Sequence, residues 1–443
     1  MSLQTRPAVQ PAVRRISMTP FERVMLLDQH PGYPMCFRLS VTVDDQLDAT
    51  RLQRSVHEAQ KRHPLLRARI DDSDNWHWRV QQNGSATVDV VDSRPPAEPI
   101  DLSVESAVRV AVVQRKQSEL CFDFHHAATD ATGAFQFLID VLLAYSGETI
   151  ERVSAEWFEE YRARLGTPKP EDSGVMKSFG RAMKTLFQRP TSLAKEKLKI
   201  PESRCDVLEH SFDVPQTKAL VQSARAQSAS VNDLLISKLL STLHGWMDER
   251  GRKSSHLRIL VPINYRSPEL LSEPARNHVG YWFLTRNTSQ LRDEGELLAG
   301  IGKEIQYARK TNQAAFFEGI FQRMARFPVV EPLIHRASSH MCLATAVLSN
   351  IGQLETGIFK PWVRANGRVV IGDTMIEDLE LAPPVRPWTH AACLAFTFRN
   401  RLRLQLQADG QAITLPDATS LLAGYSQAIL GAIESAVPLA AAG

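Results

Sequence analysis

One stretch of the chain, from Leu120 to Gly147, constrains the fold more than any other because its apolar pattern changes period partway along. In its first part, Leu120, Phe122 and Phe124 alternate with smaller or polar residues, which is typical of a strand. In its second part, apolar residues recur at steps of three and four, which predicts a helix: Phe135, Leu138, Ile139, Leu142 and Leu143. The stretch therefore predicts a strand that leads directly into a helix.

Two histidines and one carboxylate stand where the predicted strand ends: His125, His126 and Asp130. A histidine held at a strand end and oriented by neighbouring groups is able to act as a general base near neutral pH. The same residues also fit a structural role, in which both histidines are hydrogen-bonded members of the core. From these residues alone, both interpretations stay open.

The spacing His-His-x-x-x-Asp resembles the HHxxxDG signature of the acyltransferase superfamily that includes chloramphenicol acetyltransferases, peptide-synthetase condensation domains, wax ester synthases and alcohol acetyltransferases. The resemblance implies that His126 is the catalytic base and that Asp130 is structural. The glycine of the signature falls on Ala131, although Gly133 follows. A methyl group at position 131 narrows the approach to His126, and this departure keeps a non-catalytic interpretation open.

Five further segments resemble elements of the same superfamily in the expected order, between about Ser17 and Ala408: RHPLLRARI, SVNDLLISKLL, VPINYR, NHVGYWF and VLSNIG. The resemblance implies an α/β fold of two chloramphenicol-acetyltransferase-like lobes. Each lobe is expected to be a mixed sheet flanked by helices, with a channel between the two lobes.

A change in composition after residue 165 divides the chain. We predict an N-terminal lobe over residues 1–165, which carries the motif, a basic crossover linker over 166–205, and a C-terminal lobe over 206–443. From Lys177 to Lys199 there are seven basic residues and one acidic residue. This stretch fits a solvated linker helix packed on the domain surface, and it also fits a surface that binds an acidic acyl-carrier protein or an anionic membrane.

Local patterns predict the remaining elements. Alternation predicts strands over residues 36–43, 66–70, 76–81, 106–113, 209–214, 256–262, 344–349, 368–372, 393–399 and 402–408. Helical periodicity and capping residues predict helices that start at Pro20 and after Asp48, and helices over 215–226, 234–247, 294–312 and 417–437. Residues 1–15 show neither pattern and predict a loose leader.

Several other residues are candidates for the site. An ionised Asp130 on a loop of small residues needs a cation as partner, and Arg266 is our candidate. Asp130 also fits the N-cap of the following helix, and both roles can hold together. His125 is expected to support the loop by hydrogen bonding to the backbone. Ser349 and Asn350 are able to donate hydrogen bonds to an oxyanion or to the donor's pantetheine arm, although Ser-Asn-x-Gly is also ordinary turn chemistry.

Other classes of site and partner are not indicated. The cysteines are five, scattered and without C-x-x-C spacing, and adjacent histidines on a strand point to opposite faces, so we expect no disulfide framework and no metal site. The net charge of +3 does not call for nucleic acid. No apolar run is long enough to span a membrane, and no secretory signal is visible. We therefore expect a cytoplasmic protein, with a peripheral position at the membrane as the alternative.

Together these features predict an acyltransferase that moves an acyl group from a thioester to an alcohol, with His126 as general base. Acyl-CoA or acyl-phosphopantetheine would be a substrate, and no permanently bound cofactor is expected. Cys121, the one plausible nucleophile nearby, is interpreted as structural. Two alternatives remain: a stand-alone condensation enzyme that forms an amide from carrier-protein substrates, and a non-catalytic protein that binds a thioester or a lipid.

Overall fold

The strand that ends at the two histidines is an inner strand of a six-stranded sheet. Adjacent strands of this sheet are antiparallel, except that β5 and β6 at one edge are parallel. In spatial order the sheet contains β12 (Val370–Ile371), β13 (Thr374–Ala382), β2 (Cys36–Val43), β7 (Ser118–His125), β6 (Val108–Gln114) and β5 (Val88–Val91). The predicted strand therefore exists, and it ends at His125.

The computed structural model describes most of the chain. The described residues are 14–30, 32–71, 74–82, 86–166, 188–198, 207–314, 335–336 and 339–434. Nearly all of the predicted leader and most of the basic stretch 177–199 lie outside them. The described part of that stretch packs on the second lobe, where Leu193 is buried and the Leu198 amide donates to the Gln411 carbonyl at 2.7 Å.

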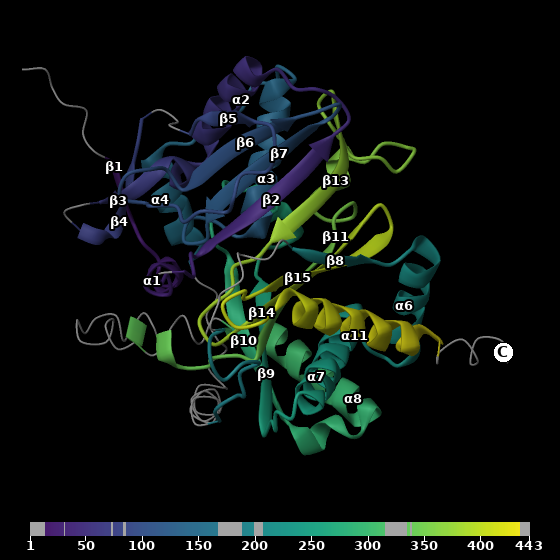
Figure 1. The fold of residues 1–443 in the computed structure, drawn as a ribbon. Coiled ribbons are helices and arrows are strands. Elements are labelled where there is room, and N and C mark those ends of the chain that lie inside the picture. Colours follow the sequence, from purple (N-terminus) through teal and green to yellow (C-terminus); the bar gives the residue numbers. More distant parts are fainter. Residues whose placement is uncertain are drawn as a thin grey trace, which may run out of the picture.

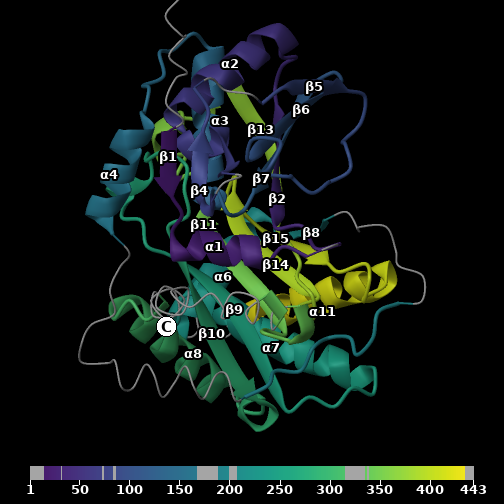
Figure 2. The same ribbon diagram turned by 90° about the vertical axis from the view of Figure 1, so that its left-hand side faces the viewer.

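A second six-stranded sheet forms the other half of the molecule (Figures 1 and 2). It is mixed, because β11 is parallel to both of its neighbours. In spatial order it contains β10 (Val279–Asn287), β9 (His256–Asn264), β11 (Ala346–Gln353), β14 (Ala391–Phe398), β15 (Arg401–Ala408) and β8 (Leu208–Ser211). The predicted fold class is confirmed: the protein has two α/β lobes, each with a mixed sheet flanked by helices.

Helices flank the sheets, and several begin after a capping side chain, including the helix predicted to start after Asp48. Thr19, Asp48 and Ser230 each accept a hydrogen bond from a backbone amide in the first turn. The first lobe contains α1 (Pro20–Leu27), α2 (Ala49–Arg62), α3 (Ala131–Tyr145) and α4 (Ala155–Leu165), and the second contains α6 (Val214–Ala226), α7 (Val231–Glu249), α8 (Glu294–Lys310) and α11 (Leu415–Glu434). Among the residues that the structure describes, no helix is both long enough and apolar enough to cross a lipid bilayer.

Short elements complete the fold. A small three-stranded sheet of the first lobe consists of β1 (Arg14–Ser17), β4 (Asp74–Val80) and β3 (Ala68–Asp71), in that order. Single turns of 3₁₀ helix lie at η1 (Pro64–Arg67), η3 (Pro268–Leu270), η4 (Thr288–Leu291) and η5 (Lys360–Trp362). Two predicted boundaries differ from the structure. Strand β1 begins at Arg14, inside the predicted leader, and the predicted strand at 66–70 begins with the 3₁₀ turn η1.

One strand lies in an unexpected place. β13 comes late in the sequence, in the region predicted as C-terminal lobe, yet it pairs with β2 and extends the sheet of the first lobe (Figure 1). The sequence pattern did not indicate it because a bulge between Ile376 and Asp378 interrupts the alternation of buried residues. The chain therefore crosses from the second lobe to the first and back again.

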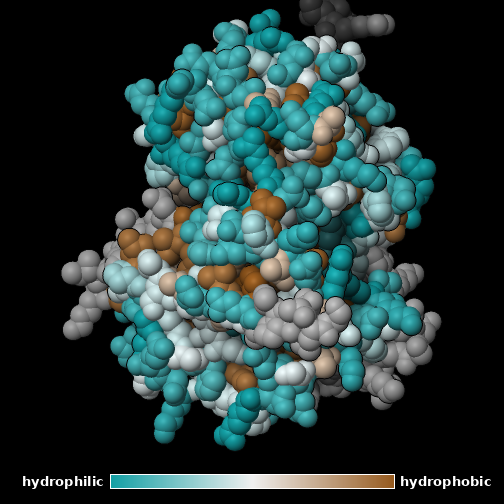
Figure 3. All heavy atoms as spheres, turned by 90° about the vertical axis from the view of Figure 1, so that its right-hand side faces the viewer, coloured by the Kyte–Doolittle hydropathy of each residue, from teal (hydrophilic) through white to brown (hydrophobic). Residues whose placement is uncertain are grey.

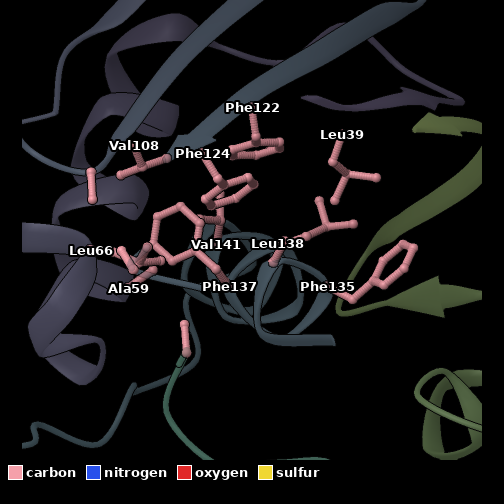
Figure 4. Close-up of a cluster of buried hydrophobic side chains, with 14 of the residues drawn as sticks. Leu39, Ala59, Leu66, Val108, Phe122, Phe124, Phe135, Phe137, Leu138 and Val141 are labelled. Carbon is pink, nitrogen blue, oxygen red and sulfur yellow. The ribbon is translucent and has the colours of Figure 1, made fainter. Parts of the chain in front are cut away.

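The core of the first lobe is aromatic and lies between its sheet and α3. Phe137 of α3 meets the rings of Phe122 and Phe124 from β7 edge-on, with ring centroids 6.0 Å apart in both pairs (Figure 4). All three side chains are buried. The β7–α3 junction is thus held by packing between its strand and its helix.

The outer surface of this lobe is mostly hydrophilic on the face seen in Figure 3, where hydrophobic residues gather instead at mid-height.

We expect Phe137→Ala to destabilise the protein strongly, because it removes a fully buried ring from this cluster. The cost should be about 3–5 kcal/mol in the free energy of unfolding, measured by chemical denaturation. Val90→Ala, at an exposed position on β5, is the control and should change stability by less than about 0.5 kcal/mol. Equal effects of the two substitutions would contradict this description of the core.

Candidate active site

His126 is the first residue after β7, and the backbone holds it firmly. Its amide donates to the Met35 carbonyl at 2.7 Å, which extends the pairing of β7 with β2 by one residue. Its ring packs edge-on against Phe37, with ring centroids 5.1 Å apart. The residue is partly exposed, and it lines a cavity.

The cavity has a volume of about 500 Å³ and lies between the two lobes. This size is in the range of small-molecule sites. The first lobe contributes Met35, Phe37, His126, Asp130, Ala131 and Thr132. Most of the remaining lining comes from the second lobe, and it includes Leu260, Asn264, Tyr265, Tyr281, Ser349, Asn350 and Leu394. The structure therefore brings His126, Asp130, Ser349 and Asn350, all predicted from the sequence, to one cavity.

His125 points away from this cavity, as expected for adjacent residues at a strand end. It is buried, and its Nε2 lies 2.7 Å from Oε1 of Gln29, while its Nδ1 accepts a hydrogen bond from the Ala127 amide at 3.1 Å. Burial, with the neighbouring His126 as a smaller cause, lowers the pKa of His125 to about 3. His125 is thus a neutral residue that fixes the turn after β7.

His126 is also kept neutral. Burial lowers the pKa of its imidazole, and the carbonyl groups of His126 and Thr129, the Asp130 carboxylate and the Asn277 side chain oppose this only in part. A neutral imidazole has one nitrogen with a lone pair, which a general base requires. Because Nδ1 is buried, the exposed edge of the ring is the one that carries Nε2.

Asp130 makes both of the contacts considered from the sequence. As N-cap of α3, its Oδ1 accepts from the Gly133 amide at 3.0 Å, and its Oδ2 accepts from Arg266 at 2.6 Å and from the His278 amide at 2.9 Å. Burial alone would raise the pKa of Asp130, but the Arg266 charge and these hydrogen bonds outweigh it and hold the pKa below its ordinary value. The carboxylate is thus fully occupied, which fits a structural role.

Arg266 lies in the loop between β9 and β10 and reaches across to the first lobe. Its Nε donates to Glu273 at 2.7 Å and its Nη2 donates to the Arg276 carbonyl at 2.7 Å, in addition to the Asp130 contact. The Glu273 carboxylate also pairs with Arg276 at 2.9 Å. Sequence reasoning did not identify Glu273. Its only signal was its place in the segment that joins the two motifs VPINYR and NHVGYWF.

Asn277 is a second residue that sequence reasoning did not single out. Its Nδ2 donates to the carbonyl of His126 at 2.7 Å and to that of Ala127 at 2.9 Å. It lies in the β9–β10 loop of the second lobe, so these bonds join that lobe to the loop of the first lobe that carries His126. The resemblance of NHVGYWF to a superfamily element was the signal that pointed to this region.

Ser349 and Asn350 lie within strand β11 and not in a turn. A bulge between Asn350 and Gly352 interrupts the pairing with β14, and Gly352 has φ of 86°, which glycine adopts without strain. The Asn350 Oδ1 accepts from the Gly352 amide at 3.0 Å, so its Nδ2 remains as a donor. Within the described residues, neither Ser349 Oγ nor Asn350 Nδ2 has a hydrogen-bond partner, and both residues line the cavity.

The backbone conformation explains why alanine is tolerated at position 131, where the signature has glycine. Ala131 is the first residue of α3, and its φ does not lie in the left-handed region, so the methyl group causes no strain. The close approach occurs at Gly133 instead. A Cβ atom there would lie 2.2 Å from Thr129 Oγ1 and 3.1 Å from the Ala275 backbone of the opposite lobe. These contacts explain a glycine at position 133, and Ala131 itself lines the cavity together with His126.

Stability below neutral pH tests the Asp130 contacts. A carboxylate whose pKa is lower in the folded protein than in the unfolded chain stabilises the fold when ionised, and this contribution is lost as the pH falls through about 4 toward the folded pKa. Asp130→Asn removes the contribution at every pH. We expect the variant to be less stable at pH 7, and its unfolding free energy to depend less steeply on pH below about 4, by up to about 1.4 kcal/mol per pH unit. Parallel curves for variant and wild type, measured by urea unfolding, would contradict this.

Comparison with known proteins gives matches in structure alone. No family model matches the sequence, and neither does any curated protein. The trichothecene 15-O-acetyltransferase from Fusarium sporotrichioides superposes with a TM-score of 0.69 at 11% identity, covering 98% of this chain and 100% of that chain. The epimerization domain from the third module of tyrocidine synthetase B gives 0.67 at 15% identity, covering 97% and 99%.

A third similar structure is the condensation domain of the monacolin K polyketide synthase, with a TM-score of 0.66 at 13% identity, covering 96% of this chain and 98% of that chain. At these identities the likeness shows the fold, and it extends over nearly the whole of each chain. The chain therefore has the same two-lobed fold as these acetyltransferase, epimerization-domain and condensation-domain structures, which agrees with the fold expected from the sequence.

Proposed function

We propose that the protein is an acyltransferase that moves an acyl group from a thioester to a hydroxyl acceptor, with His126 as general base. The observation that carries the proposal is the shared cavity: a neutral imidazole from the first lobe faces the same space as two hydrogen-bond donors from the second lobe. Acyl transfer needs these two kinds of group, a proton acceptor for the attacking hydroxyl and donors for the developing oxyanion.

The reaction would proceed without a covalent enzyme intermediate. The acceptor oxygen attacks the thioester carbonyl carbon while Nε2 of His126 takes the hydroxyl proton. The carbonyl oxygen becomes an oxyanion, to which Ser349 Oγ and Asn350 Nδ2 are the candidate donors. When the intermediate collapses, the C–S bond breaks and the imidazolium returns its proton to the leaving thiolate, which yields an ester and a free thiol.

The proposed reaction steps do not need a nucleophilic cysteine. Cys121 lies on β7 and is buried, and its burial raises the pKa of the thiol to about 11, so it is a thiol at neutral pH. In the described part of the chain, no group of three histidine, cysteine or acidic side chains is placed to hold a metal ion. Acyl-CoA or an acyl-phosphopantetheine is proposed as a substrate that enters the cavity.

The second candidate is amide formation, in which an amine replaces the hydroxyl. The same base and the same donors would serve it. Support comes from similarly folded domains whose names place them in a peptide synthetase and a polyketide synthase, whereas the 15-O-acetyltransferase supports an oxygen acceptor. A carrier protein would then be the donor, and residues 177–199 are the proposed docking segment. A peripheral position at an anionic membrane remains a proposal for the same segment.

A substrate screen tests the proposal. Wild-type protein is incubated with acyl-CoAs of graded length and with mixed alcohols and amines, and both thiol release and product mass are recorded. We expect an ester product, and a decrease in kcat of about 10²–10⁴-fold for His126→Ala. His256→Ala is the matched control, because His256 lies at the other end of β9 from the cavity. Full transfer by His126→Ala would remove the mechanism, and amide products alone would favour the second candidate.

The pH dependence of kcat/KM gives a second test. The base must be unprotonated, and burial lowers the pKa of His126 below its ordinary 6.5. As the pH is lowered, His126 therefore becomes protonated at a lower pH than a free imidazole does. With an alcohol acceptor, which does not titrate in this range, we expect the acidic limb of kcat/KM to have its midpoint below pH 6.5. A midpoint above pH 6.5 would contradict the assignment.

A further inference from the structure

One charge in the wall of the cavity has no opposite charge beside it. Among the lining residues that the structure describes, three carry a formal charge: Asp130, Arg309 and Arg386. Asp130 is paired with Arg266, and Arg386 donates to the buried carboxylate of Asp28 at 2.5 Å. Because His126 is neutral, the guanidinium of Arg309 is the one charge of the described lining that is not balanced.

Arg309 is exposed, and its side chain has no polar partner. It is the second-to-last residue of α8, and the described part of the chain gives its guanidinium no hydrogen bond, ion pair or ring contact. Residues three or four positions away on a helix are the usual partners of such a side chain. Here those positions hold no carboxylate: Ile305, Gln306, Asn312 and Gln313.

A second polar group without a partner lies three residues further along. Asn312 has φ of 51° and ends α8 in a Schellman motif, in which its amide donates to the Arg309 carbonyl at 3.3 Å. The amide of Gln313 completes the motif by donating to the Ala308 carbonyl at 2.9 Å. Glycine is the usual residue at this position, whereas asparagine adds a carboxamide. That carboxamide also lines the cavity, and it has no hydrogen-bond partner among the described residues.

The two side chains together suit a carboxylate. A guanidinium presents its N–H donors in a planar fork that matches the two oxygens of a carboxylate, and a carboxamide adds a further donor. The charge agrees as well, because one unbalanced positive charge is offset by one carboxylate, whereas a phosphate monoester brings nearly two negative charges at neutral pH. Much of the other lining is apolar, such as Leu260, Val347 and Leu394, and suits a carbon chain that carries the carboxylate.

We propose that Arg309 and Asn312 form a binding site for a carboxylate group of the substrate that occupies the cavity. The inference deepens the proposed function and rests on it for the reaction that this substrate enters. The carboxylate can come from either of two molecules. The acceptor would be a hydroxy acid, or the transferred acyl group would be that of a dicarboxylic acid.

Binding is measured first, without any thioester. The full-length chain is titrated at pH 7.5 by isothermal calorimetry with ω-hydroxy acids and dicarboxylic acids of graded chain length, and with their methyl esters. We expect the acids of one class to bind about 10–100-fold more tightly than their esters, as is typical of hydrogen bonds to a charged group. Equal affinities for acids and esters would overturn the proposal.

Three substitutions test the two side chains. Arg309→Gln should abolish the preference for acids over esters. Asn312→Gly should weaken it less, and it keeps a residue that adopts the left-handed backbone without strain. Lys310→Gln is the matched control, because it removes a charge from the same end of α8 at a position that does not line the cavity. A preference that survives Arg309→Gln, or that Lys310→Gln also abolishes, would contradict the proposal.

Transfer assays then identify the source of the carboxylate. The values of kcat/KM are compared for hydroxy acids and their methyl esters as acceptors, and for succinyl-CoA and butyryl-CoA as donors. A preference for the acid in one comparison, lost in Arg309→Gln, assigns the carboxylate to the acceptor or to the acyl group. If Arg309→Gln instead weakens the binding of CoA itself and leaves the acids unaffected, the guanidinium binds the phosphates of the donor and the proposal is wrong. If the wild type binds the acids selectively but transfers no acyl group, the proposed function fails while the carboxylate site stands.

Discussion

The ion pair between Asp130 and Arg266 is the contact on which the rest of the site depends. A carboxylate and a guanidinium are buried where the two lobes meet, 2.6 Å apart, and each has further hydrogen bonds that satisfy it. A buried charge is tolerable only when it is paired in this way, and removing one partner of such a pair typically costs about 3–5 kcal/mol. The pair thus fixes the β7–α3 loop of one lobe against the β9–β10 loop of the other, and the cavity forms beside it.

The three residues of the motif therefore have different surroundings. His125 is buried beneath the turn and bonds to Gln29. Asp130 and His126 both line the cavity, but the Asp130 carboxylate is occupied by Arg266 and the His278 amide of the opposite lobe. Adjacent residues at a strand end face opposite ways, so the doubled histidine supplies one side chain to the core and one to the cavity.

Much of this arrangement could be predicted from the sequence. The period change around Phe124 and Phe135 located the site, and the superfamily resemblance led to Arg266, Ser349 and Asn350. What remained hidden depends on contacts between distant segments. Glu273 and Asn277 have no periodic pattern, and their roles exist only because the loop that carries them reaches the other lobe. β13 was missed for a local reason, since its bulge breaks the alternation that identifies strands.

The placement of β13 has a consequence for how the lobes can move. The chain leaves the first lobe before β8, returns to complete its sheet as β13, and crosses again to reach β14. The lobes are therefore joined by this strand as well as by the buried ion pair and the Asn277 hydrogen bonds. A hinge-like separation of the lobes would have to break the hydrogen bonds that pair β13 with β2, or separate the buried charges of Asp130 and Arg266. With the lobes held in this way, the cavity of about 500 Å³ limits the size of any molecule that can lie beside His126.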